Sequence, residues 1–355
     1  MSAGPVLDFR SDTRTLPDAR MRAAMAGAQV GDDAYGDDPG VLELQRRGAR
    51  LLGTQAALFV PSSTMANLLA VLAASPAPGA APGTGPGAVV VTGADSHLAR
   101  FEAQGVRRFA GAALVPVAQG PDGAPRPGPW ARAIGGAAGR PLVVSLENTC
   151  MLHTGNALPP RVLEAAAAAA RRQGAHVHLD GARLGNAAVA LGLPVARLAA
   201  CADSVTFCLA KGLGAPVGSL LGAGRDFVAR ARELRGQLGG TMHQAGVVAA
   251  AALAALDRLP ELAADHALAA ALTAALAALD GVQTARPPCP TNIVAVRVPG
   301  LDAAALTGRL AAAGVLVLPL DDGWVRLVVH RAHTRAAVPA VAAAVRHAAT
   351  APVPH

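Results

Sequence analysis

Lys211 is the only lysine in a chain of 355 residues that has 31 lysine and arginine residues in all. Arginine carries a positive charge as well as lysine does, but only a primary amine deprotonates near neutral pH and condenses with a carbonyl. The segment 208–219 (CLAKGLGAPVGS) therefore predicts that Lys211 forms a Schiff base. A lysine retained by chance in an arginine-rich chain is the alternative, so the prediction depends on what accompanies Lys211.

Two further segments carry groups that suit a cofactor. In 176–183 (HVHLDGAR) a strand delivers Asp180 at its carboxyl end, and Lys211 follows after a helix-sized segment and another strand. Open α/β sheets bind ligands where such strands end. In 61–67 (PSSTMAN), the small hydroxyl residues Ser63 and Thr64 begin a helix whose N–H groups suit a phosphate. Taken alone, that segment is better explained as an ordinary helix cap.

An amine, a carboxylate and a phosphate cradle together meet the needs of pyridoxal 5'-phosphate. Lys211 would hold its aldehyde, and Asp180 would keep its ring nitrogen protonated, which makes the ring an electron sink. His97 follows a predicted strand in the segment 95–98 (DSHL) and could stack on the ring or act as a base. The alternative for a loop histidine is a structural role.

The composition argues against several other classes of protein. The four cysteines show no CxxC or paired spacing, which suits reduced thiols in a cytoplasmic protein and neither a disulfide framework nor a metal site. The formal charge is +7, but the arginines are scattered and aromatic residues are 3% of the chain. We therefore expect a solvated surface and no nucleic-acid partner. We also expect no membrane span and no secretory signal.

An α/β fold would bring these residues together. From about residue 40, short apolar runs alternate with helix-sized segments, which predicts a mostly parallel sheet flanked by helices. The runs are 57–61, 88–92, 113–117, 142–146, 176–179, 204–209 and 219–222. A short helix is expected after Pro17, which suits a first helical turn. The Pro-, Gly- and Ala-rich segments 75–87 and 119–140 are predicted to be surface loops.

The C-terminal part reads as a smaller α+β unit. Alanine-rich helices are expected within 243–280, followed by strands near 291–298 and 324–330 and helices near 302–313 and 335–349. The chain thus divides into an N-terminal arm and active-site loop (1–40), a large cofactor-binding domain (41–250) and a small C-terminal domain (251–355).

These segments resemble the low-specificity L-threonine aldolase family of fold-type-I pyridoxal phosphate enzymes. The matching motifs are DFRSDT, GDDAYGDDP, PSSTMAN, ENT, HLDGARLGNAAVALG, CLAKGLGAPVGS, GGTMHQAG, TNIV and VRLVVH. They cover most of the chain and are highly specific in combination. The resemblance implies the fold of that family, with a large α/β domain and a small α+β domain. It also implies a cytoplasmic homo-oligomer, a dimer of dimers with active sites at a dimer interface.

The resemblance also implies a role for each cofactor-binding position. Lys211 would hold the cofactor and Asp180 would face its ring nitrogen. Ser63 and Thr64 would bind the phosphate, and His97 would stack on the ring. Lys211, His97 and Asp180 would form the catalytic set.

The implied substrate site uses a second group of residues. Ser11, Arg183 and Arg326 would clamp the substrate α-carboxylate, a task that suits the bidentate fork of arginine. Arg183 would also contribute to the cofactor site. Tyr35 would line the site from a neighbouring subunit, and Cys150 occupies the position of a substrate-hydroxyl contact.

The activity that the resemblance implies is the cleavage of L-threonine, L-allo-threonine and related β-hydroxy-α-amino acids to glycine and an aldehyde. A base would remove the β-hydroxyl proton while the cofactor accepts the electrons of the breaking bond. One alternative is a β-eliminating amino-acid lyase on the same fold, although tryptophanase-like members carry a second lysine where this chain has Gly212. Another is a non-catalytic scaffold that retains the fold.

The chain departs from the family pattern at four positions. Cys150 replaces a histidine that is a candidate base, and a neutral thiol is a poor hydrogen-bond partner. We expect the rate or the threo/erythro preference to differ, with His153 or a water activated by His97 as substitutes. Ala210 stands where serine is usual. His243 and Gly236 stand where an arginine and a lysine are usual near the phosphate.

Overall fold

The computed structural model describes residues 6–75, 87–137 and 139–350. Its centre is a seven-stranded sheet with the strand order β2-β8-β7-β6-β5-β3-β4, in which β8 is antiparallel to both of its neighbours. The strands are β2 (Ala56–Val60), β3 (Val89–Gly93), β4 (Ala113–Val117), β5 (Leu142–Glu147), β6 (His176–Gly181), β7 (Ser204–Cys208) and β8 (Ser219–Ala223). Every predicted apolar run is therefore a strand, and the mostly parallel sheet is confirmed.

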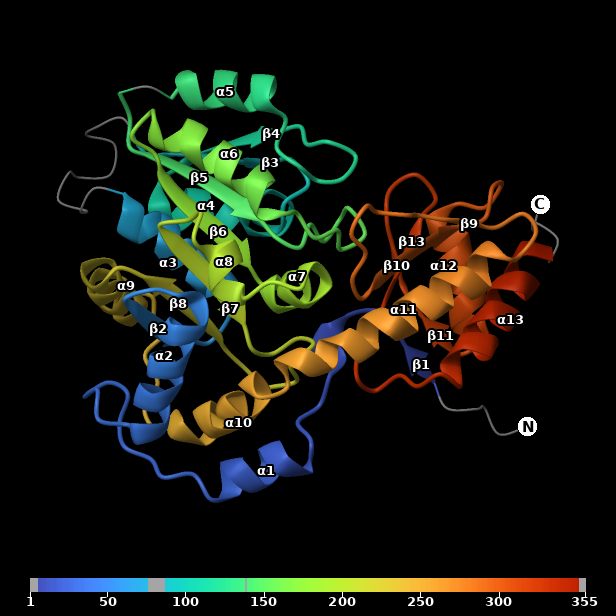
Figure 1. Ribbon diagram of the computed structural model, residues 1–355, viewed down its shortest axis with the longest axis horizontal. Helices are drawn as coiled ribbons and strands as arrows, with labels where there is room; N and C mark the ends of the chain where they lie inside the picture. Colours follow the sequence, from blue (N-terminus) through green and yellow to red (C-terminus); the bar gives the residue numbers. More distant parts are fainter. Residues whose placement is uncertain (1–5, 76–86, 138, 351–355) are drawn as a thin grey trace.

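Helices cover both faces of this sheet (Figure 1). One layer consists of α3 (Ser63–Ala74), α4 (Ala103–Ala110) and α9 (Arg225–Gln237), whose apolar side chains pack on Leu58, Val60, Val90 and Val143. The other consists of α2 (Pro39–Leu52), α5 (Pro127–Gly135), α6 (Pro160–Arg171), α7 (Leu184–Leu191), α8 (Val195–Ala199) and α10 (Gly246–Leu256). Strands covered on both faces must be apolar on both, which explains the continuous apolar runs of the sequence.

Two local predictions are wrong in part. The segment 119–140 is not simply a surface loop, because α5 lies within it and buries Trp130 and Ile134 against the sheet. Its first residue is Pro127, and proline suits a first helical turn because it needs no hydrogen-bond donor there. The short helix expected after Pro17 is present as α1 (Ala19–Ala26), but Pro17 lies before its first turn, because the side chain of Asp18 caps that helix. Of the segment 75–87, residues 76–86 lie outside the described residues.

The C-terminal unit has its own core and a four-stranded antiparallel sheet in the order β12-β13-β10-β9. Its strands are β9 (Gln283–Thr284), β10 (Ile293–Arg297), β12 (Leu318–Pro319) and β13 (Val325–Val328). Its helices are α11 (Leu262–Ala277), α12 (Ala303–Ala312) and α13 (Ala337–Thr350). The predicted α+β character of this unit is confirmed.

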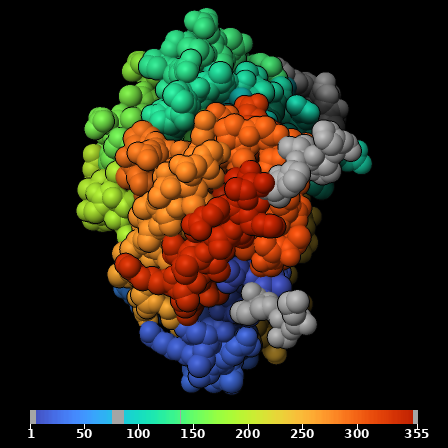
Figure 2. Space-filling view, turned by 90° about the vertical axis from the view of Figure 1, so that its right-hand side faces the viewer, coloured from blue at the N-terminus to red at the C-terminus, as the bar shows by residue number. Residues whose placement is uncertain are grey.

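The N-terminal arm joins the two units. Strand β1 (Leu7–Asp8) pairs with β11 (Val315–Leu316), and Phe9 is buried in the C-terminal core. The 3₁₀ turn η1 (Asp12–Arg14) then leads back to the large unit. Figure 2 shows the orange and red C-terminal segments in front, with green segments of the large unit above them and blue N-terminal segments below. The arm therefore brings residues 11–15 to the junction of the two cores.

The connection in the other direction runs through α10, the turn η3 (Leu259–Glu261) and α11, which extends into the C-terminal unit (Figure 1). The expected domain boundary at residue 250 lies within α10, and the three-part division stays a prediction. No helix in the described ranges is long and apolar enough to cross a membrane.

Candidate active site

A cavity of about 400 Å³ lies where β5, β6 and β7 end and where α3 begins. Six of the residues singled out in the sequence line it, namely Lys211, Asp180, His97, Ser63, Thr64 and Arg183. They come from separate elements along the chain, and the shared strand direction gathers them at one edge of the sheet. The structure thus brings the predicted cofactor residues together.

Lys211 stands in the loop that connects β7 to β8. Its backbone carbonyl accepts hydrogen bonds from the hydroxyl of Thr15 (2.7 Å) and from the N–H of Gly214 (2.9 Å). Gly214 has a φ of +85°, a left-handed conformation that favours glycine and closes the turn. In the described part of the chain the Lys211 amine makes no hydrogen bond or ion pair. These hydrogen bonds fix the backbone of Lys211, and its amine remains available to a ligand in the cavity.

The start of α3 forms the opposite wall. Ser62 caps the helix by accepting a hydrogen bond from the N–H of Met65 (3.1 Å), and the Ser63 hydroxyl pairs with that of Ser219 (2.7 Å). The first N–H groups of a helix have no intrahelical acceptor, and the helix dipole is positive at this end. With Ser62, Ser63 and Thr64 lining the cavity, this wall suits an anion such as a phosphate.

Asp180 lies on β6, directly between Glu147 of β5 and Thr206 of β7 in the sheet register. It is 3% exposed, and its two oxygens accept hydrogen bonds from the amide of Asn67 (2.9 Å) and the N–H of Ala182 (3.0 Å). A carboxylate has about four acceptor positions, so Asp180 retains capacity for a further donor from the cavity.

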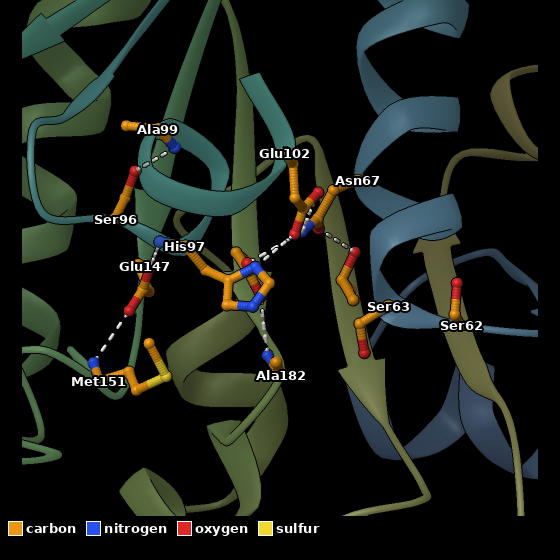
Figure 3. Close-up of polar contacts among 12 residues, drawn as sticks. Ser62, Ser63, Asn67, Ser96, His97, Ala99, Glu102, Glu147, Met151 and Ala182 are labelled. Atoms are coloured by element: carbon orange, nitrogen blue, oxygen red, sulfur yellow. Dashed lines mark hydrogen bonds and ion pairs between the residues drawn. The ribbon is translucent and has the colours of Figure 1, made fainter. Parts of the chain in front are cut away.

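The His97 ring points toward the buried Glu102, and the Glu147 side chain meets the His97 backbone (Figure 3). Nδ1 of His97 lies 2.6 Å from Oε1 of Glu102, and the His97 backbone N–H donates to Oε2 of Glu147 (2.5 Å). Burial lowers the pKa of His97, but the hydrogen bond from its ring to Glu102 and the charge of Asp180 outweigh that effect, so the pKa is raised overall. Burial and the charge of Asp180 raise the pKa of Glu147 to about 7. Glu147 therefore titrates near neutral pH.

Glu102, Glu147 and Asn67 were missed in the sequence. Two of them carried a usable signal, because Glu147 directly follows the predicted strand 142–146 and Asn67 belongs to the PSSTMAN segment. Glu102 carried none, since its position depends on a π-helical turn, η2 (Leu98–Glu102), that carries it back toward His97.

Arg183 and Arg326 form a buried cationic group with one carboxylate. Arg183 donates to both oxygens of Asp12 (2.8 and 2.6 Å), and both side chains are at most 5% exposed. Arg326 donates to the carbonyl of Arg10 (3.1 Å), and its buried Nε has no partner in the described part of the chain. Burial and the charge of Arg183 lower the pKa of Arg326 to about 10, which leaves it charged at neutral pH. Two guanidinium groups thus share one carboxylate, and the remaining positive charge is available to bind an anionic ligand.

Four of the predicted substrate residues do not line the cavity, namely Ser11, Tyr35, Cys150 and Arg326. The Ser11 side chain instead caps η1, and Thr13 of that turn reaches the cavity. Tyr35 is 85% exposed. The thiol of Cys150 faces the carbonyls of Gly123 (3.6 Å) and Glu147 (3.5 Å), and burial raises its pKa. Their substrate roles stay predictions.

The structure also shows the contacts of His243, which departs from the family pattern, and of His153, the possible substitute for the missing histidine. His243 is largely exposed and lies 3.0 Å from Asp32 in the acidic loop. His153 lies between the Pro121 carbonyl (3.2 Å) and Asp95 (3.4 Å), outside the cavity. Neither histidine contacts the cavity wall in a single chain.

Comparisons with known proteins show the family of this chain. Residues 8–299 match the model of the family described as beta-eliminating lyase. The low specificity L-threonine aldolase of Escherichia coli (strain K12) is 38% identical over 342 residues, covering 95% of this chain and 98% of that protein. The probable low-specificity L-threonine aldolase 2 of Arabidopsis thaliana is 38% identical over 333 residues, covering 91% and 92%. The solved threonine aldolase of Leishmania major superimposes with a TM-score of 0.79 at 23% identity, covering 96% and 99%, which confirms the fold class.

Proposed function

Because this chain belongs to the β-eliminating lyase family and its low-specificity L-threonine aldolase branch, we propose that it is a pyridoxal phosphate-dependent aldolase. Its substrates would be L-threonine, L-allo-threonine and related β-hydroxy-α-amino acids, cleaved to glycine and an aldehyde. The observation that carries the proposal is the convergence of Lys211, Asp180 and the start of α3 on one cavity.

The residues of the cavity fit the cofactor. Lys211 offers an amine that has no competing partner among the residues that the structure describes. The first turn of α3 suits the phosphate, and Asp180 has acceptor capacity for a protonated ring nitrogen. His97 lines the wall beside Asp180 and can stack on a ring. When bound, the cofactor supplies an electron sink for the bond that breaks at the substrate Cα.

The substrate carboxylate would bind at the cationic group. Asp12 neutralises one charge of the Arg183–Arg326 pair, and the remaining charge matches a carboxylate. Two guanidinium groups fix a planar anion in orientation as well as in position. This orientation decides which bond at Cα faces the cofactor, and so favours cleavage of Cα–Cβ over loss of the α-proton.

The His97–Glu102 pair is our candidate to receive the β-hydroxyl proton, directly or through a water molecule. Its 2.6 Å contact would hold one proton between a histidine and a carboxylate, and such a pair can accept or donate a proton at a substrate hydroxyl. Glu147, with its pKa of about 7, supports the His97 backbone and offers a second site for a proton.

The activity is tested with purified, cofactor-loaded protein incubated with L-threonine and L-allo-threonine. Acetaldehyde with glycine supports the aldolase, whereas ammonia with 2-oxobutanoate would identify a β-eliminating lyase instead. Absence of both product pairs across several β-hydroxy amino acids, with the cofactor bound, would indicate a non-catalytic scaffold.

The cofactor anchor has a separate test. Borohydride reduction should fix the cofactor covalently to the wild-type protein and not to Lys211→Ala. The Lys211→Arg variant is the matched control, because it keeps the charge and lacks a condensable amine. Covalent fixation in either variant would show that Lys211 is not the anchor.

We further propose that the protein works in the cytoplasm as a homotetramer in which a neighbouring subunit completes the site. Tyr35 is 85% exposed and lies outside the cavity of its own chain, so only a second copy could bring it to a substrate. The four cysteines are unpaired, as expected for a reducing compartment. Sedimentation of the wild-type protein and of Tyr35→Phe, combined with their KM values, tests this assembly.

A further inference from the structure

A stripe of polar side chains crosses the buried face of the sheet beneath α3, where a parallel sheet is normally apolar. His176, His178 and Asp180 alternate along β6 and therefore point to one face. Ser204 and Thr206 of β7 are their register partners, with Ser204 beside His178 and Thr206 beside Asp180. We name these five residues the β6–β7 polar stripe. Buried polar groups on this scale need a complete set of partners.

Asn67 of α3 provides the central partner of the stripe. Its amide nitrogen donates to Oδ2 of Asp180 (2.9 Å) and to Oε1 of Glu102 (3.2 Å). Ionised carboxylates only accept hydrogen bonds, so the amide must turn its N–H groups toward them. The amide oxygen then faces the other way, where the Thr206 hydroxyl (2.8 Å) and Nε2 of His178 (3.0 Å) donate to it.

This arrangement also determines the tautomer of His178. Burial lowers its pKa to about 4, so the ring is neutral at physiological pH and has one donor and one acceptor nitrogen. Because Nε2 donates to Asn67, Nδ1 must accept from the hydroxyl of Ser204 (2.8 Å). Ser204 in turn accepts from Nε2 of His176 (2.8 Å), whose ring stacks on Phe227. The hydrogen bonds thus run in one direction, from His176 through Ser204, His178 and Asn67 to Asp180 at the cavity. We call this chain the line of donors.

We propose that His178 and Asn67 are positioning residues that hold the Asp180 side chain in the orientation that the ring nitrogen of the bound cofactor needs. Neither residue lines the cavity, so each acts through Asp180. The inference deepens the proposed function and rests on it, because it takes pyridoxal phosphate as the occupant.

The physical consequence follows from the amide of Asn67. The hydrogen bond from His178 to the amide oxygen helps to fix the orientation of the Asn67 amide. Without it, the amide could turn over and place its oxygen against Asp180. Two acceptors that face each other repel, which weakens the hold of the Asp180 side chain on the ring proton. The polar stripe is therefore expected to control the protonation of the cofactor ring and not only the packing of the sheet.

Three variants test the role of the line of donors. His178→Leu removes both ring nitrogens at similar volume, whereas His178→Gln can still donate to Asn67 and accept from Ser204. Thr206→Val is isosteric and removes the second donor to the Asn67 oxygen. The matched control is His266→Leu, because Nε2 of His266 bonds the Asn186 oxygen (2.9 Å) and burial lowers its pKa to about 4, but it lies outside the site.

The readout is the ¹⁵N chemical shift of ring-labelled cofactor across pH, together with the cofactor Kd and a thermal melt for each variant. In His178→Leu we expect binding about tenfold weaker and deprotonation of the ring nitrogen about one pH unit lower, as for the loss of one hydrogen bond to a charged network. Thr206→Val should shift both quantities in the same direction by less. His178→Gln and His266→Leu should stay within about twofold of wild type.

Two results would overturn the inference. One is a folded His178→Leu or Thr206→Val protein whose ring nitrogen titrates as in wild type. The other is His178→Gln shifting as far as His178→Leu, which would make bulk packing the cause. If His178→Leu does not fold, Thr206→Val decides. Failure of the wild-type protein to fix the cofactor on Lys211 would overturn the proposed function itself, and the inference with it.

Discussion

Replacing Asp12 by asparagine tests whether the buried ion pair with Arg183 stabilises the junction between the two units. Asp12 lies in η1 at 0% exposure, and both of its oxygens bind the Arg183 guanidinium at 2.8 and 2.6 Å. Asparagine keeps the shape and one acceptor but removes the charge. The guanidinium would then be buried beside Arg326 without a counter-charge, which is a costly arrangement.

The magnitude follows from the pKa of the Asp12 carboxyl. Burial alone would raise it, but the charge and hydrogen bonds of Arg183 lower it from 3.8 to about 2. Since one pKa unit corresponds to about 1.4 kcal/mol, the ionised form contributes about 2.5 kcal/mol to stability at neutral pH. Breaking a buried pair from one side costs about 3 to 5 kcal/mol, because the remaining charge is left unpaired. We therefore expect Asp12→Asn to lose about 2.5 to 5 kcal/mol.

The assay is urea unfolding of the wild type and of Asp12→Asn between pH 2.5 and 7. Because the folded-state pKa is lowered, the contribution is complete above the unfolded pKa of 3.8 and disappears as the pH falls through about 2. The difference between the two proteins should therefore shrink below pH 4. Both proteins contain all other carboxyl groups. The contribution of those groups therefore cancels in the difference between the two unfolding free energies.

Asp8 provides the matched control. Its hydrogen bond to Arg10 likewise lowers its pKa to about 2, but its partners Arg10 and Arg14 are 42% and 59% exposed. Water screens such a pair, so Asp8→Asn should cost less than about 1 kcal/mol. Equal losses for the two substitutions, or a loss for Asp12→Asn that does not change with pH, would refute the argument from burial.

Three further predictions concern the carboxylate clamp, a buried acid and the position of Cys150. Arg326→Lys should lower kcat/KM for L-threonine by about 10²-fold, because lysine cannot form the planar fork, and a steady-state assay that finds less than a threefold loss would contradict the clamp. Asp265, on α11, has its pKa raised to about 7 by burial and by the charge of Asp12. The wild type should therefore lose stability as pH rises from about 4 to 7, and Asp265→Asn should be more stable at pH 8 by up to about 4 kcal/mol, with no gain in urea melts below pH 4. Cys150→His should destabilise by about 1 to 3 kcal/mol, since the thiol is packed against Gly123, and should change the threo/erythro preference; an unchanged preference would place this position away from the substrate.

The sheet was predictable from the sequence because strands covered by helices on both faces need continuous apolar runs, and few other elements have that pattern. Helix α5 was not, because its composition resembles a loop. Its helical signal consists of Pro127 at the first position and of Trp130 and Ile134 four residues apart. Four-residue spacing places two side chains on one helix face, but a single such pair is too weak to outweigh proline and glycine content.

The site was predictable as far as single residues follow strand ends, which holds for Asp180 and for Ser63. What could not be predicted is the pairing between elements, such as Asn67 with Asp180 and His97 with Glu102. Such pairs depend on the rotation of a helix against a sheet, which no periodicity in one segment records. The segment HVHLD did carry a signal, because its alternating histidines are anomalous for a central strand of a parallel sheet.

Acidic and positively charged groups occupy different walls of the cavity, and this separation determines the orientation of a bound ligand. Asp180, Glu102 and His97 gather at one wall, with polar atoms within 4.8 Å of one another, and Glu147 adjoins them. The helix dipole of α3 and the surplus guanidinium charge provide positive potential elsewhere. A ligand with a cationic ring nitrogen, a phosphate and a carboxylate satisfies all three regions at once, and only in one orientation. Because they bind the folded protein, the cofactor and the substrate should stabilise the fold as well as react in the cavity.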